Sequence, residues 1–188
     1  FQDLPYQLYP NQRMDMLDNE QLRLNLRYTG AFDWGALEMR AYREKVDHFM
    51  DFGADKRFIY TKIGQPPSAL CTEAQQTAGI CAAGMPMYSE SKNTGLVLKA
   101  DVSLSETDLL RLGAEYQHYT LDDWWPPSGP GMSPDTFWKV RDGERHRAGI
   151  FAEWEKQVSS QWTTLAGVRY ERVKTDAGDV QGYDPTTD

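Results

Sequence analysis

The sequence predicts an all-β fold, an antiparallel meander of about six strands. Three observations predict it. Apolar and polar residues alternate over several segments, the links between these segments alternate between short and long, and aromatic residues gather beside two of the short links. Alternation with a period of two indicates strands, because successive side chains of a strand point to opposite faces of a sheet.

Each expected strand has an apolar face rich in leucine or alanine and a polar face. In the first strand, Leu22 and Leu24 share one face, and Arg23 and Asn25 share the other. Consecutive strands of this kind are expected to pair as antiparallel neighbours. The apolar faces carry, in order along the chain, Leu22, Leu24, Leu26 and Tyr28; Leu37, Met39 and Ala41; Leu96, Leu98, Ala100, Val102 and Leu104; Leu110, Leu112, Ala114 and Tyr116; Ala148, Ile150, Ala152 and Trp154; Thr164, Ala166, Val168 and Tyr170.

The link lengths favour a membrane barrel over a soluble sandwich. The links at 30–35, 105–108 and 158–161 are short, whereas those at 52–92 and 122–143 are long. Outer-membrane barrels alternate short periplasmic turns with long extracellular loops. A soluble sandwich has no reason to sort its links in this way. The sequence therefore predicts part of a transmembrane β-barrel with long extracellular loops.

Aromatic residues beside the short links fit this interpretation. Tyr28, Phe32 and Trp34 flank the first short link, and Trp154 and Trp162 flank the third. An interfacial aromatic girdle would lie at this level of a barrel. The middle short link has no aromatic neighbour, and aromatic residues are also common in ordinary strands.

Charge and length narrow the class of protein. The formal net charge is −8, which argues against a nucleic-acid partner because such a partner requires clustered lysine and arginine. No apolar run is long enough for a membrane-spanning helix, but a spanning strand needs only about 10 residues. Since single-chain barrels need about eight strands or more, we expect residues 1–188 to be a partial barrel domain cut from a longer chain. Its open strand edges could then cause self-association.

His48 and Met50 form a candidate metal-binding pair. Spaced i and i+2 on an extended strand, their side chains point to the same side, with Cα atoms about 6 to 7 Å apart. Imidazole suits copper, and thioether is a soft ligand that favours Cu(I). The alternative is that the methionine fills a gap in a core or faces lipid, with the histidine at the rim.

Two further methionine pairs share this spacing. Met14 and Met16 precede the first strand, and Met85 and Met87 close the longest link, where Pro86 favours an extended backbone. Repetition of the spacing makes bound copper a reasonable hypothesis. The predicted metal ligands are His48, Met50, Met85 and Met87.

The two cysteines, Cys71 and Cys81, enclose a short polar segment of the longest link. A disulfide between them would close a small ring and stabilise the fold by about 3 kcal/mol in the chain-entropy model. An extracellular loop lies in an oxidising compartment, which favours the disulfide. A thiolate ligand to copper is the alternative.

Other candidate residues carry weaker patterns. Trp124 and Trp125 open the second long link, either as an aromatic anchor at the membrane interface or as part of a ligand vestibule. His118 shares the face of Tyr116 and is expected at the interface, while His146 has no evident partner. No nucleophile lies beside a base and no phosphate-binding loop is present, so the sequence does not predict an enzyme.

The polar faces alternate carboxylates with arginines, which predicts a wet lumen lined with charge rather than a catalytic site. The residues concerned are Arg23, Arg27, Glu38, Arg40, Glu44, Arg111, Glu115, Arg147, Glu153, Arg169 and Glu171.

Several stretches carry a pattern that extends over nearly the whole chain: NQRMDMLDN leading into LRLNLRYTGAFDWGALEMRAYRE, then GMPMYSESKNTG, LRLGAEYQHYTLDDWWPP and FAEWEKQVSSQWTTLAGVRYE. Together they resemble the barrel of a TonB-dependent outer-membrane receptor. The methionine pairs and the His-x-Met element resemble the copper-receptor branch of that family.

This resemblance implies import of a ligand across the bacterial outer membrane, powered through TonB. It also implies that a His and a Met of the barrel bind copper together with a Cys and a Met of a plug domain, and His48 and Met50 match the barrel element. The plug, the TonB box and the plug's Cys-x-x-x-Met element are not present, so we expect an incomplete site. The alternatives are a receptor for another cargo, such as a siderophore or metal chelate, and a soluble all-β binding module.

Overall fold

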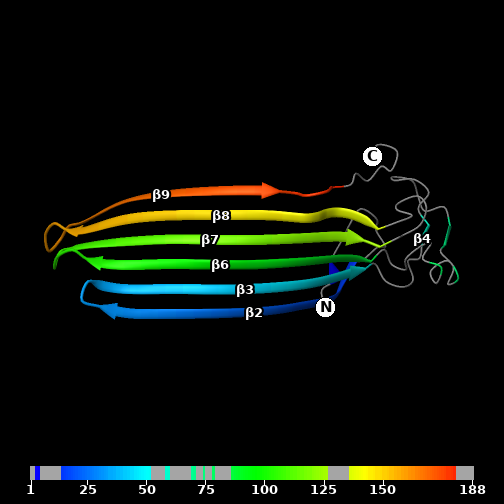
Figure 1. Cartoon of the computed structure of the whole chain (residues 1–188), viewed down its shortest axis with the longest axis horizontal. Helices are drawn as coiled ribbons and strands as arrows, with labels where there is room; N and C mark the ends of the chain where they lie inside the picture. Colours follow the sequence, from blue (N-terminus) through cyan, green and yellow to red (C-terminus); the bar gives the residue numbers. More distant parts are fainter. Residues whose placement is uncertain are drawn as a thin grey trace.

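The computed structural model describes residues 3–4, 14–51, 58–59, 69–70, 74, 78, 86–126 and 136–180. Within these ranges one antiparallel sheet dominates, with the strand order β1-β2-β3-β6-β7-β8-β9 (Figure 1). Its long strands are β2 (Met14–Phe32), β3 (Gly35–Asp51), β6 (Met87–Ser103), β7 (Asp108–Trp125), β8 (Phe137–Gln157) and β9 (Thr163–Asp176).

The short strands add little to this sheet. β1 (Asp3–Leu4) pairs with β2, while β4 (Phe58–Ile59) and β5 (Ala69–Leu70) form a separate two-stranded sheet. The long strands form a meander in which each pairs with its neighbour in the chain, so the predicted fold class is confirmed. No helix in the described part of the chain is long and apolar enough to span a membrane.

The short links lie at one end of the sheet, and the strand ends that the long links join lie at the other end, as predicted (Figure 1). The first short link ends at Gly35, which has a φ of 140°. A Cβ atom there would lie 1.8 Å from the carbonyl oxygen of Asp101 on β6. Only glycine therefore fits this turn, because it is the one residue that combines this backbone conformation with no side chain.

The strands are longer than the sequence predicted. They contain 14 residues in β9 and 21 in β8, whereas about 9 to 11 residues span a bilayer. The predicted long links at 52–92 and 122–143 are in fact 52–86 and 126–136. The prediction was wrong because the hydropathy of the added strand ends does not alternate regularly; around Glu90 and Lys92, for example, β6 is polar on both faces.

One face of the sheet, here called the apolar face, exposes large hydrophobic side chains. Leu26 is 72% exposed, Ile150 60% and Val168 71%. Among the described residues, Phe137 is the one large hydrophobic side chain that is buried. A water-soluble sheet would bury this face against a second layer, whereas a barrel wall presents it to hydrocarbon.

The height of the apolar band fits a membrane. On β8 the apolar face runs from Trp154 through Ile150 to His146, where it becomes polar. The eight residue steps between Trp154 and His146 span about 26 Å at 3.3 Å each. A strand tilt of about 40° reduces this length to a height of about 20 Å, close to the apolar band of about 25 Å in outer-membrane barrels.

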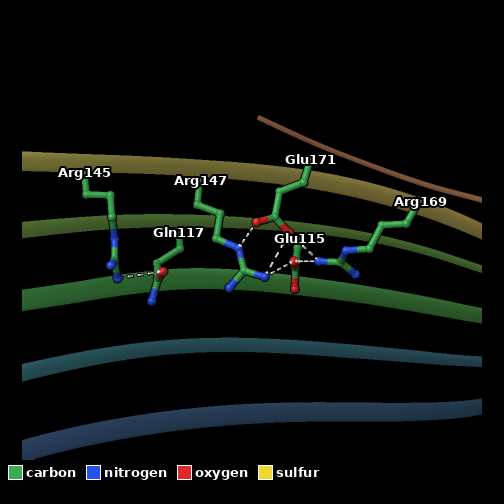
Figure 2. A network of polar contacts seen from close by, with 6 residues as sticks. All are labelled: Glu115, Gln117, Arg145, Arg147, Arg169 and Glu171. Atoms are coloured by element: carbon green, nitrogen blue, oxygen red, sulfur yellow. Dashed lines mark hydrogen bonds and ion pairs between the residues drawn. The ribbon is translucent and has the colours of Figure 1, made fainter. Parts of the chain in front are cut away.

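The opposite face, here called the polar face, carries cross-strand ion pairs. Arg147 contacts Glu115 at 3.1 Å and Glu171 at 2.9 Å, and Arg169 contacts both carboxylates (Figure 2). Gly149 lies between the two glutamates in register. Because glycine has no side chain, Glu115 on β7 and Arg169 on β9 can meet across β8. The predicted ladder of charges is present along this face.

Two glycines of the polar face are covered by aromatic rings. A Cβ at Gly95 would lie 2.3 Å from the ring of Tyr42, and one at Gly113 would lie 2.0 Å from the ring of Phe151. Each ring comes from the strand paired with its glycine. The rings shield backbone that the glycines leave bare, as aromatic residues do beside glycines in other sheets.

Aromatic residues gather near both ends of the strands. At the short links, the predicted residues Phe32 and Trp34 stack with ring centroids 5.1 Å apart. At the other end, the apolar face carries a row that crosses four strands, with successive centroids 4.7, 5.6 and 5.5 Å apart. The row consists of Phe49, Tyr88, Trp124 and Trp138. Trp124 and Trp125 thus end strand β7 rather than open a loop.

Candidate metal site

Three of the predicted metal ligands lie together on the polar face, at the end of the sheet that carries the long links. His48 and Met50 lie on β3, on the face shared with Glu44. Met87 begins β6 and pairs directly with Met50, while His48 pairs with Ser89. Directly opposed residues of neighbouring strands have Cβ atoms about 4.5 to 5.5 Å apart. The register therefore brings two thioethers and one imidazole into a small area.

A third methionine shares this register. Met16 on β2 pairs with Met50, so Met16, Met50 and Met87 occupy one row across three strands. A β-bulge follows Met16 in the pairing with β3. The predicted ligand Met85 and the predicted disulfide between Cys71 and Cys81 lie outside the described residues.

The ring of His48 is oriented by β2. Its Nδ1 atom lies 3.2 Å from Oδ1 of Asn19, its register partner. When Nδ1 donates its proton to this amide oxygen, Nε2 keeps its lone pair. A histidine that binds a metal through one ring nitrogen commonly donates from the other nitrogen in this way. In that tautomer, Nε2 of His48 would be available as a ligand atom.

A carboxylate that the sequence analysis did not select lies beside this group. Asp123 on β7 pairs with Ser89, which in turn pairs with His48. Its side chain is 15% exposed, lies 3.7 Å from Nζ of Lys139, and interacts electrostatically with His48. Oδ1 of Asp123 makes no hydrogen bond within the described residues. A half-buried carboxylate with a free oxygen favours a cation nearby.

The chemistry of these donors favours a soft metal ion. Thioethers bind Cu(I) well, and imidazole binds both oxidation states of copper. The donors face the polar side of the sheet, where ion pairs and water would line a lumen. The described residues contribute His48, Met50 and Met87, so a complete site would take further ligands from outside them.

The opposite face holds a second group that sequence reasoning missed. His146, for which the sequence showed no evident partner, lies with its Nδ1 atom 3.0 Å from the hydroxyl of Tyr116 and its Nε2 atom 3.3 Å from Glu144. His118, predicted at the interface, stacks on His146. No sequence pattern indicated these contacts, because the register of β7 and β8 decides them.

Comparison with known proteins places this sheet among membrane barrels. A solved structure named "Copper transporter OprC" is similar over 87% of this chain, with a TM-score of 0.59 and 19% sequence identity. The match covers 24% of that protein's chain, so this chain spans about a quarter of its length. No curated protein matches the sequence. The family described as "TonB dependent receptor-like, beta-barrel" matches residues 1–188, and the chain belongs to that family.

Proposed function

We propose that this chain is part of the barrel wall of a TonB-dependent receptor in the bacterial outer membrane, and that the receptor imports copper. Residues 1–188 form a partial barrel domain in this proposal. A plug domain elsewhere in the receptor would couple transport to TonB. The family is one of transport receptors rather than enzymes. Because its members are barrels, the family does not support a soluble binding module.

One observation carries the copper assignment. His48, Met50 and Met87 lie on adjacent strands of the polar face, with Met50 and Met87 directly paired. Methionines with no metal-binding role would more often lie on the apolar face, as Met39 does with an exposure of 39%. The name of the structurally similar copper transporter agrees with this cargo, although that similarity by itself shows only the fold.

The residues suggest how the barrel wall would bind the copper ion and let it pass. Soft donors at the loop end would capture Cu(I), since thioethers compete poorly for hard ions such as Mg²⁺. Asp123 would offset part of the positive charge. The ion pairs further along the polar face are already internally neutralised, so they would not trap a released cation.

The proposal also covers two predictions that fall outside the described residues. Met85 would add a thioether from the segment before β6, and Cys71 and Cys81 would form a disulfide in the extracellular link. Alkylation of the intact receptor with and without prior reduction, followed by mass spectrometry, measures the disulfide. Labelling of both cysteines without reduction would contradict it.

The test is copper retention by the intact receptor. Cu(I) affinity is measured by competition with a chromogenic chelator under reducing conditions. His48→Ala and Met50→Leu should each weaken binding by at least about tenfold, and the double variant should retain no copper. Met39→Leu is the matched control, because it removes a thioether from the apolar face and should leave the affinity unchanged.

Two outcomes would contradict copper as the cargo. Unchanged Cu(I) binding in the double variant would remove His48 and Met50 from the site. Absence of Cu(I) binding to the intact wild-type receptor would leave the family assignment in place but favour another cargo, such as a siderophore or other metal chelate.

A further inference from the structure

We infer a second metal site on the apolar face, formed by His118, Glu144 and His146, that binds a divalent transition ion such as Zn²⁺. The three residues lie on β7 and β8 at the loop side of the apolar band. Because the sheet separates them from His48 and Met50, this site is distinct from the proposed copper site and does not rest on it.

The register of one hairpin assembles the group. His118 pairs directly with His146, and their rings stack nearly parallel, with centroids 4.4 Å apart and an angle of 8°. Glu144 lies two residues before His146 on β8, so it shares the same face. One ligand atom from each of the three residues lies within 4.8 Å of the others.

One of the two separations between Glu144 and a histidine nitrogen matches a tetrahedral ion, and the other is longer. Oε2 of Glu144 lies 3.3 Å from Nε2 of His146, and Oε1 lies 3.9 Å from Nε2 of His118. Zinc binds imidazole nitrogen at about 2.0 to 2.1 Å and carboxylate oxygen at about 2.0 to 2.2 Å, so two ligands of a tetrahedron lie about 3.4 Å apart. The nitrogen of His118 would have to move closer to Glu144 when the ion binds.

The hydrogen bonds of the group also point to a metal. Tyr116 accepts or donates at Nδ1 of His146 over 3.0 Å. When Nδ1 is the donor, Nε2 is left as the ligand atom, and Tyr116 takes the outer-shell position that orients metal-bound histidines. Nε2 of His118 is buried and makes no hydrogen bond in the part of the chain that is described. Bound metal would give this orphaned nitrogen a partner.

Two neighbouring positive charges weaken the binding of a metal cation, and an apolar row on the same face marks the level of the site in the membrane. Lys174 on β9 pairs with His146 in register, and Arg172 precedes it on the same face. Both cations weaken the binding of a further cation. The next row toward the short links contains Tyr116, Ala148 and Arg172, and the row after it, which contains Ile150, is apolar. The site therefore lies close to the level where the membrane gives way to water. The fourth ligand would be water.

Bound zinc would connect β7 to β8 just outside the hydrocarbon. The two histidines come from different strands and the carboxylate from β8, so the ion would cross-link β7 and β8. Anything that binds the folded state but not the unfolded state stabilises it by mass action. The expected consequence is a zinc-dependent rise in the unfolding temperature of the barrel.

The experiment is a Zn²⁺ titration of the intact receptor in detergent, with zinc alone as the probe. The wild type should bind Zn²⁺ with a rise in the unfolding temperature. His146→Ala and the isosteric Glu144→Gln should each lower the affinity by at least about tenfold. His48→Ala should leave both readouts unchanged. Lys174→Gln should raise the affinity, because it removes the cation that faces His146.

Two results would overturn the inference. One is a wild-type receptor that shows no zinc-dependent stabilisation. The other is equal zinc affinity in the wild type and in Glu144→Gln, a variant that preserves side-chain shape and is therefore expected to fold. In that second case, loss of zinc binding in His48→Ala would assign the ion to the opposite face.

Discussion

A lysine introduced on the apolar face distinguishes a membrane barrel wall from a soluble sheet. Ile150 lies in the middle of the apolar band on β8, with Ala114 and Tyr170 as its register partners, and is 60% exposed. Val97 lies on the polar face between Arg40 and Glu115. Ile150→Lys and Val97→Lys are a matched pair, since each replaces a β-branched aliphatic residue of an inner strand.

The solvent at each face determines the expected cost. In water, a substitution at a position as exposed as Ile150 changes the free energy of unfolding by about 0.5 kcal/mol or less. At the midplane of a bilayer, lysine on the lipid face of a barrel costs about 2 to 4 kcal/mol. At 1.4 kcal/mol for each factor of ten, that range lowers the folding equilibrium constant roughly 30- to 700-fold.

The assay is reversible unfolding of the intact barrel in lipid vesicles, with denaturant as the variable. Ile150→Lys should lose about 2 to 4 kcal/mol of unfolding free energy. Val97→Lys should change it by about 1 kcal/mol or less, because the new ammonium faces Glu115 in a polar environment. Equal costs for the two variants would refute the assignment of the faces, as would a cost for Ile150→Lys near zero.

Three further predictions concern individual contacts. Gly113→Ala should destabilise the barrel by about 1 to 3 kcal/mol, because its Cβ would lie 2.0 Å from the ring of Phe151. Adding Phe151→Ala should recover part of that loss in a double-mutant cycle, and strict additivity would contradict the contact. Glu171→Gln should lower the midpoint of unfolding at low ionic strength, since this carboxylate binds two arginines. The difference from wild type should shrink in about 1 M salt, where the screening length is about 3 Å, and a salt-independent difference would contradict an ionic cause. Trp124→Ala should cost about 1 to 3 kcal/mol by removing two ring contacts from the aromatic row, whereas no change in denaturant midpoint would contradict a stabilising role.

The sequence was sufficient to predict the strands and their faces wherever one face was apolar. The contrast between Leu24 and Arg23, for example, is decisive because lipid and lumen require opposite side chains. The same criterion missed the strand ends. Around Glu90 and Lys92 the β6 strand is polar on both sides, since it extends beyond the hydrocarbon, and no alternation remains to be detected.

Part of the candidate metal site could also be predicted. His48 and Met50 share a face because a strand alternates with a period of two, and no tertiary information is needed. The pairing of Met50 with Met87 depends on the register of two strands joined by the long link 52–86. No local pattern fixes that register. Asp123 was missed for a related reason, because the segment that contains it was assigned to a loop.

The histidine cluster also depends on strand register, which no local sequence pattern fixes, even though its two strands are consecutive in the chain. His118 and His146 face each other only because β7 and β8 keep a regular register from Asp108 to Leu121. The register shifts between Leu121 and Asp123, so a bulge nearer the short links would have separated the two rings. The link that joins the two strands gives no sequence signal for either fact.

The most direct measurement is the accessibility of nitroxide labels placed one at a time at Leu96, Val97, Leu98 and Lys99 of β6 in the intact barrel in a bilayer. Labels at Leu96 and Leu98 should collide with dissolved oxygen, which concentrates in lipid. Labels at Val97 and Lys99 should collide less with oxygen and more with a water-soluble nickel reagent. Four labels with the same accessibility, or an alternation of the opposite phase, would contradict an apolar face turned to hydrocarbon and a polar face turned to the lumen.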